Sequence, residues 1–453
     1  MPIPVFCHHI TGFALAPFPA SGRCWGRGQA AMLRVVLGSL IFAATLILII
    51  TRPFRLTEAI ISAGGGLLML LCGIVAPGDA VSVLLSQWNI FGFFLGLMVI
   101  AAIADSAGIF DTLAYQAAML ARGNSLRLYL AIFAVGALIT AFLSNDATAL
   151  ILTPVVYALV TRLRLPALPF MFACTFIADT ASFVLPVSNP INILILDAFG
   201  GDMGAFLRYL ALPALACIAL NIGMFTLIFR HSLGVRYDVA AVVAPTLDRR
   251  YLRAVMGVLM IIALGYVAAS ALGVPLSLVA LGGGLLLIGA AAWAGRLDVA
   301  RWRRDISWSL FVFIAGMFVL VRGIENLGIT GTFGRALLHL AGSSQLGAVA
   351  LAAGGTALGA NLINNVPMAL VMISAIHSVH TSAATQTGMV FAMILGADLG
   401  PNLTAVGSLA TILWLLILRR KGLEISTIEY IKLGLAVVPV MLALGVLLIW
   451  LRL

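Results

Sequence analysis

Long apolar segments dominate this chain, and clusters of polar residues interrupt two regions of it. Uninterrupted segments of the length that crosses a bilayer, about 17–25 residues, fall near residues 32–51, 57–77, 88–107, 205–229, 251–273, 275–294, 306–326 and 428–450. The longer regions 125–194 and 344–418 contain the polar clusters. Each is predicted to hold a re-entrant hairpin followed by one broken crossing helix. The pattern predicts an all-α polytopic membrane protein with about ten transmembrane helices and two re-entrant hairpins.

Polar residues in the two halves of the chain share one spacing. A separation of 219 residues relates Asn145-Asp146 to Asn364-Asn365, Asp179 to Asp398, and Asn189 to Ser408. With an odd number of crossings in each half, the two repeats should have inverted topology, which in transporters places a binding site near the membrane midplane. The predicted divisions are an N-terminal extension (1–31), a first repeat (32–229), a cytoplasmic linker (230–250) and a second repeat (251–453).

Composition agrees with a lipid environment. Apolar residues make up 62% of the chain and charged residues only 9%, whereas an ordinary soluble domain has about 25% charged residues. The net charge of +10 comes from basic residues spread between apolar segments, so it favours topology-setting loops over nucleic-acid binding. In the predicted topology, 19 of the 26 Lys and Arg residues lie on one face. That face should be cytoplasmic, with both termini outside.

The polar clusters offer ligands for a small solute. Non-helical backbone at membrane depth persists only where it is buried in protein or lines a cavity. Amide and hydroxyl side chains in these segments could hold a small polyhydroxy molecule. The candidate substrate-binding residues are Asn145, Thr148, Ser188, Asn189, Asn364, Asn365, Thr404 and Ser408.

Asp146, Asp179 and Asp398 are the candidate proton-coupling residues. A carboxylate at the bilayer centre costs about 2.5–3.5 kcal/mol on insertion scales, so its presence favours a function. Burial away from water favours the neutral form of a carboxyl group over its charged form, which would let these groups take up and release protons. The structural alternative is that each one caps a half-helix. The five cysteines form no C-x-x-C pair, and neither a metal site nor a cofactor is predicted.

At these clusters the sequence resembles the arsenite/antimonite efflux permeases of the ion-transporter superfamily. The matching segments are the Asn-Asp pair at 145–146 with 149–154, then 176–182 with 187–189, 364–367, and 397–401 with 407–411. The resemblance extends from about residue 32 to the C-terminus. One departure is Ala147, where members of the family often have glycine.

The resemblance implies a transporter rather than an enzyme. It implies efflux of trivalent arsenic or antimony, as the neutral trihydroxide, across the bacterial inner membrane in exchange for protons, which would confer arsenite resistance. It also implies a possible soluble arsenite-stimulated ATPase partner. A neutral solute feels no force from the membrane potential, so its uphill export needs a coupled charge. One charge crossing 100 mV supplies about 2.3 kcal/mol.

Other functions are compatible with parts of the pattern. A sodium/proton antiporter of the same superfamily could use Asp146, Asp179 and Asp398 as sodium ligands. A dicarboxylate carrier is disfavoured because Asp146 and Asp179 would face an anion. An intramembrane enzyme would need a nucleophile with its base or an H-E-x-x-H metal motif, and neither occurs in the predicted spans. A passive channel does not need the alternating access that inverted repeats provide.

Overall fold

The computed structural model describes residues 24–51, 56–298, 300, 306–404 and 407–453. These residues form helices, with no β-strand among them beyond a single antiparallel bridge between Asn124 and Arg236. Residues 1–23 of the predicted N-terminal extension lie outside the described part. From Cys24 the chain is already helical, so the first helix begins eight residues before the expected span.

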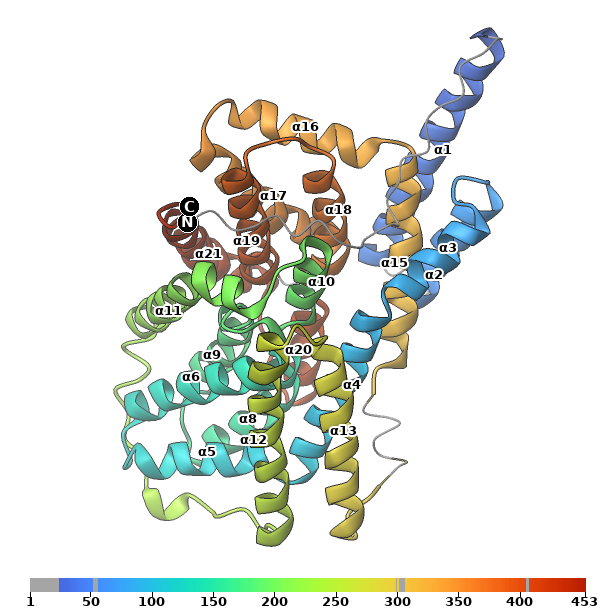
Figure 1. Cartoon of the computed structure of the whole chain (residues 1–453). Coiled ribbons are helices and arrows are strands. Elements are labelled where there is room, and N and C mark those ends of the chain that lie inside the picture. The colour runs from blue at the N-terminus through green and yellow to red at the C-terminus, as the bar shows by residue number, and fades with distance from the viewer. Residues whose placement is uncertain (1–23, 52–55, 299, 301–305, 405–406) are drawn as a thin grey trace.

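The first half of the chain contains two interrupted helical regions between longer helices (Figure 1). Its helices are α1 (Cys24–Thr51), α2 (Glu58–Leu71), α3 (Pro77–Ser86), α4 (Trp88–Ser106), α5 (Ile109–Leu120), α6 (Ser125–Phe142), α7 (Asn145–Ala147), α8 (Thr153–Arg162), α9 (Ala167–Thr180), α10 (Pro190–Phe199) and α11 (Met203–Ile228). A π-helical turn (Thr148–Leu152) joins α7 to α8, and a 3-10 turn (Pro186–Ser188) precedes α10.

The second half repeats this order. Its helices are α12 (Arg249–Ala271), α13 (Leu276–Trp293), α15 (Trp308–Asn326), α16 (Ile329–Ala341), α17 (Gln345–Ile363), α18 (Asn365–His377), α19 (Ala383–Leu399), α20 (Leu409–Arg420) and α21 (Thr427–Trp450), with a 3-10 turn (Gly400–Leu403) after α19. Helices α4, α5 and α6 begin 220 residues before α15, α16 and α17. That the halves cross the membrane in opposite directions, and that the hairpins are re-entrant, stay predictions.

Nine helices in the described part are long and apolar enough to cross a membrane. The expected span at 57–77 is shorter than predicted, because α2 ends at Leu71. Gly73 follows with a φ of 65°, a left-handed conformation that commonly ends helices, and Pro77 then starts α3. Helix α2 has 14 residues and is about 21 Å long.

Two pairs of closely packed helices stand beside the interrupted regions. Helix α2 packs along α15, and α4 packs along α13. Glycines allow both approaches: a Cβ on Gly316 would lie 2.5 Å from the Ser62 carbonyl carbon, and one on Gly66 would lie 3.3 Å from the Gly316 oxygen. Gly96 likewise lies against the Ala280 backbone. Small residues at such crossings let membrane helices approach closely. We call α2, α4, α13 and α15 the scaffold helices.

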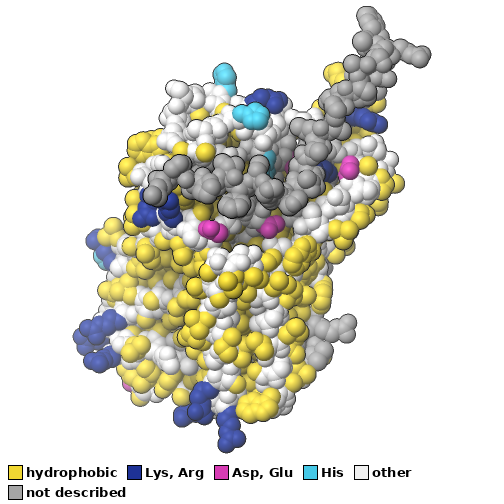
Figure 2. Space-filling view, in the orientation of Figure 1, with side chains coloured by type: hydrophobic (Ala, Val, Ile, Leu, Met, Phe, Trp, Pro, Cys, Tyr) yellow, Lys and Arg dark blue, Asp and Glu magenta, His cyan; other side chains and the backbone are white. Residues whose placement is uncertain are grey.

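The surface is suited to lipid. Figure 2 shows hydrophobic side chains over most of the visible face, with Lys and Arg side chains gathered at its lower and left edges and a smaller number near the upper end. Large apolar side chains are widely exposed, including Leu227 at 64%, Leu264 at 63% and Leu285 at 68%. Such exposure would be unfavourable in water but is expected for helices whose outer faces contact acyl chains.

Candidate functional site

The tip of the first hairpin lies where α6 ends and α7 begins. Ser144 is extended there, and its hydroxyl accepts a hydrogen bond from the Ala147 amide at 3.1 Å. This cap leaves Asn145 buried and Asp146 half-buried at the tip. Thr148 is fully buried, and its hydroxyl pairs with that of Thr140 at 2.7 Å. Thr148 therefore holds the two arms of the hairpin together, and its predicted role as a solute ligand stays a prediction.

The break between α9 and α10 is held by polar side chains of the same segment. Ser182 donates to the Asp179 carbonyl at 2.7 Å, and Asn192 donates to the Ser182 carbonyl at 2.7 Å. Ser188 donates to the carbonyl of Ala141, on the first hairpin, at 3.1 Å. Asn189 caps α10 by accepting from the Ile191 amide at 3.1 Å. These bonds satisfy backbone groups that the broken helix exposes.

The second hairpin turns at Asn364, between α17 and α18. Asn364 has φ 74° and ψ 155°, a conformation that few residues other than glycine adopt. Its side chain and that of Asn365 both accept from the Val366 amide, at 3.3 and 3.0 Å. The side-chain oxygens of both residues therefore help to begin α18.

The break between α19 and α20 is held from the second hairpin. The Asn361 amide of α17 donates to the Gly400 carbonyl at 2.7 Å, and its oxygen accepts from the Thr404 hydroxyl at 2.7 Å. Gly407 lies so close that an added Cβ would come within 2.6 Å of the Asn361 side-chain oxygen. Ser408 caps α20 by accepting from the Thr411 amide at 3.1 Å. The side chains of Thr404 and Ser408 therefore form hydrogen bonds only with residues of their own half in these contacts.

Three carboxyl groups come together between these breaks. The Asn189 amide donates to Asp398 Oδ1 at 2.6 Å, and both residues are buried. The other oxygen of Asp398 has no hydrogen-bond partner among the described residues. Asp179 lies near Asp398 and Asp146, with the Asn145 side chain beside it. Within the described residues, no group of three or more His, Cys, Asp or Glu side chains is arranged to hold a metal ion.

A second polar link and a cluster of aromatic rings surround these groups. The Asn402 amide donates to the Phe176 carbonyl at 3.4 Å, which joins the second break to α9. Asn402 also accepts from the Tyr430 hydroxyl at 3.3 Å. Phe176 packs against Phe225 and Tyr430 with ring centroids 4.7 and 5.5 Å apart. These rings therefore pack around α9, the helix that carries Asp179.

Two buried residues of this region were not predicted from the sequence. Asn221 on α11 donates to the Thr180 hydroxyl at 2.7 Å, and its side-chain oxygen has no partner among the described residues. A lone Asn inside an apolar span is costly, and that signal could have identified it. Tyr430 lies at the start of the last span, a position that predicts a tyrosine anchored at the membrane interface. Its complete burial is a result of tertiary packing.

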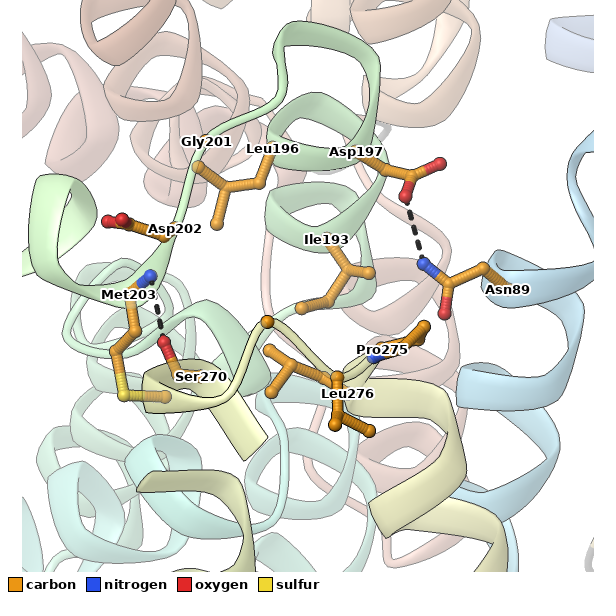
Figure 3. Close-up of a pocket in the computed structure, with 12 residues that line it drawn as sticks. Asn89, Ile193, Leu196, Asp197, Gly201, Asp202, Met203, Ser270, Pro275 and Leu276 are labelled. Carbon is orange, nitrogen blue, oxygen red and sulfur yellow. Dashed lines mark hydrogen bonds between the residues drawn. The ribbon is translucent and has the colours of Figure 1, made fainter. Parts of the chain in front are cut away.

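A cavity of ≈ 220 Å³ lies at the far end of α10 from Asn189 (Figure 3). Asp197 of α10 accepts from the Asn89 amide of scaffold helix α4 at 3.0 Å. Across the cavity, the Met203 amide donates to the Ser270 hydroxyl at 3.2 Å. The cavity contains none of the predicted site residues. Helix α10 therefore connects the buried carboxyl groups at one end with the scaffold at the other.

Comparison with known proteins gives one family and several relatives. The family model described as "Arsenical pump membrane protein" matches residues 37–451. The chain is 32% identical over 407 residues to the arsenical pump membrane protein of Escherichia coli (strain K12), covering 88% of this chain and 95% of that protein. The arsenical pump membrane protein of Yersinia enterocolitica is 32% identical over 406 residues, with the same coverage. A 46 kDa membrane protein of Mycobacterium leprae is 28% identical over 376 residues, covering 81% of this chain and 86% of the relative.

Two solved transporter structures share the fold. The YdaH transporter of Alcanivorax borkumensis aligns with a TM-score of 0.56 at 16% sequence identity, covering 93% of this chain and 97% of the other. MtrF of Neisseria gonorrhoeae aligns with a TM-score of 0.54 at 14% identity, covering 93% and 94%. The predicted fold class, an all-helical polytopic membrane protein, is thereby confirmed.

Proposed function

Because the chain belongs to the arsenical pump membrane protein family, we propose that it exports trivalent arsenic or antimony as the neutral trihydroxide in exchange for protons. The chain is a multi-pass protein of the bacterial inner membrane, with nine helices in its described part that can cross a bilayer. An arsenical is its substrate class. We propose in addition that the arsenic or antimony is trivalent, that it is carried as the neutral trihydroxide, and that its export is exchanged for protons.

The meeting of Asp146, Asp179 and Asp398 is the observation that carries the exchange. Carboxyl groups that share one buried site cannot all be ionised at low cost, so the group tends to hold protons. The Asn189 amide donates to one oxygen of Asp398, and the second oxygen lacks a partner among the described residues. That oxygen can hold a proton or accept a hydrogen bond from a hydroxyl of the solute. Competition between the two would couple solute binding to proton release.

Amide side chains suit a neutral trihydroxide better than thiols or cations would. Asn145, Asn189 and Asn365 are buried at the hairpin tips and the first break. Each can donate to a solute oxygen and accept from a solute hydroxyl. Thiolates would bind trivalent arsenic too tightly for rapid release, and the buried Cys174 and Cys217 are both free. The proposed ligands are therefore the asparagines, with Ser188, Thr404 and Ser408 shaping the breaks around them.

Proton exchange supplies enough energy for efflux. One charge crossing 100 mV yields about 2.3 kcal/mol, which sustains a solute gradient of about 50-fold. Export driven by proton exchange does not require an ATPase partner. Such a partner stays a prediction from the family resemblance.

Everted membrane vesicles with an imposed proton gradient test the proposal. Arsenite uptake should depend on the gradient, and it should fall in Asp179→Asn and Asp398→Asn at equal protein level. Uptake that ignores both the gradient and these substitutions would refute the coupling. Sodium-dependent proton movement without arsenite uptake would instead favour the sodium/proton antiporter.

A further inference from the structure

A second cavity lies away from the carboxyl groups, between α5, the inter-repeat linker and the start of α12. Its volume is ≈ 530 Å³. Tyr115 and Gln116 line it from α5, Leu247 from the linker, and Arg249 and Arg253 from α12. The two arginines are four residues apart, so they lie on one face of α12. Three separate elements therefore surround one basic cavity.

The charge in this cavity is positive. Its lining includes two arginines and no carboxylate. Asp248 stands next in the chain, but it is already engaged: Oδ1 accepts from the Arg250 and Tyr251 amides at 3.0 and 3.2 Å, and Oδ2 pairs with Arg296 at 3.6 Å. The backbone amides of Tyr251 and Arg250, followed by Arg296, lower the pKa of Asp248, so it stays ionised and paired. Among the described residues, no carboxylate lies within ion-pair distance of Arg249 or Arg253.

The walls of the cavity are fixed by the linker. Tyr237 donates from its hydroxyl to the Ala118 carbonyl at 2.6 Å and from its amide to the Gly123 carbonyl at 2.9 Å. Leu247, at the other end, packs against Gly108, where an added Cβ would overlap it. The linker is thus fastened to both ends of α5. A ligand would enter a cavity that is already formed, with little ordering cost.

An exposed apolar stripe continues from the arginines along α12. Met256, Met260, Leu264 and Val267 are 49%, 63%, 63% and 61% exposed. Their spacing of three and four residues places them on the same face as Arg249 and Arg253. Two basic residues at the start of the helix, followed by an apolar stripe, match a negatively charged headgroup followed by an acyl chain.

We propose that this cavity binds the phosphate of an anionic phospholipid. Arg249 and Arg253 pair with the phosphate, the hydroxyl of Tyr115 and the amide of Gln116 offer further donors, and one acyl chain lies along Met256 and Met260. Both arginines stand in the first two turns of a 23-residue helix that can cross the bilayer, which puts them at headgroup depth. Basic pockets between membrane helices are suited to anionic headgroups.

Lipid binding to the purified full-length protein tests this site. Native mass spectrometry and thermal unfolding would compare added phosphatidylglycerol with phosphatidylcholine. The test variant is Arg249→Gln/Arg253→Gln. The matched control is Arg419→Gln/Arg420→Gln, which removes two exposed arginines from the last turn of α20. Phosphatidylglycerol affinity should fall by about fivefold for each cavity arginine removed and by roughly 25-fold for the pair. The control should bind as the unchanged protein does.

Three outcomes would overturn the proposal. An equal loss in the control would mean general surface attraction, and equal binding of phosphatidylcholine would mean that the phosphate charge is not recognised. Stabilisation by inorganic phosphate alone, lost in the cavity variant, would assign the site to a soluble anion. If the double variant does not fold, the single variants Arg249→Gln and Arg253→Gln decide, since each should show its own fivefold loss.

Discussion

The two broken helices occupy matching places in the two halves, yet different residues hold them. In the first break, Ser182, Ser188 and Asn192 satisfy the exposed backbone, and Ser188 reaches the carbonyl of Ala141. Gly407 stands 219 residues after Ser188 and has no side chain. There Asn361 reaches across from the hairpin instead. The same gap is therefore bridged from the broken helix in one half and from the hairpin in the other.

The comparison extends to the carboxyl groups. Asn189 caps α10 and also binds Asp398 in the other half. Its counterpart Ser408 bonds to Thr411 on its own helix. Asp179 instead lies beside Asn145 of its own half. The first half thus supplies two carboxyl groups and also the amide that holds the third. Its polar residues should matter more for transport than their counterparts do.

The largest expected effect is on the buried carboxyl groups. Asp179→Asn and Asp398→Asn should each lower gradient-driven arsenite uptake by roughly 10- to 100-fold, the range of ordinary coupling energies. Asp146→Asn should have a smaller effect, because that residue is only half-buried. Asp111→Asn, at an exposed position on α5, is the control and should transport normally. Initial uptake rates in everted vesicles give the ranking, and an Asp146 effect larger than the other two would reverse it.

Adding a methyl group should distinguish the two breaks. Gly407→Ala would place a Cβ within 2.6 Å of Asn361 Oδ1 and the Pro401 Cα, so it should destabilise the protein by about 1–3 kcal/mol. Ser188→Ala removes hydroxyl bonds to Ala141 and Leu185 without adding atoms, and about 1 kcal/mol is expected. Thermal unfolding in detergent compares them. Equal midpoints would show that the second break relaxes around the added methyl.

The two helix caps should also differ. Asn189→Ala removes the α10 cap and leaves Asp398 Oδ1 without its donor, which should cost about 1–3 kcal/mol and reduce transport. Ser408→Ala removes only the α20 cap and should cost about 0.5–2 kcal/mol. The informative measurement is uptake per folded molecule. If both variants lose uptake equally, the link between Asn189 and Asp398 has no special part in transport.

The mildest substitution is Asn364→Gly, at the second hairpin tip. Asn364 has a positive φ that glycine adopts without strain, so Asn364→Gly should change stability by less than about 1 kcal/mol. Asn364→Ala loses the cap and keeps the strained backbone, and it should cost about 1–3 kcal/mol. Ser144 at the first tip is extended and loses only its cap on substitution by Ala. The unfolding midpoint should fall least for Asn364→Gly and most for Asn364→Ala, with Ser144→Ala between them. An Asn364→Gly variant as unstable as Asn364→Ala would argue against strain at this tip.

Most of the helical architecture could be predicted from the sequence. Apolar segments predicted the spans, because the interior of a bilayer admits only backbone that is hydrogen-bonded internally. The constant spacing of Asp179 with Asp398 located both breaks, and the cost of a buried charge marked these residues as candidates for function. The end of α2 at Leu71 was not predicted, because hydropathy continues past the turn at Gly73.

Which polar groups meet could not be predicted and depends on how the helices pack. Sequence spacing relates Asn189 to Ser408, but the bond from Asn189 runs to Asp398, because the two broken helices pack against each other. The same spacing gave no reason to join Asn402 to Phe176 or to bury Tyr430 and Asn221 beside them. The spacing of polar residues along a sequence predicts which face of a helix avoids lipid. Which side chains satisfy one another across that face depends on distances that only packing fixes.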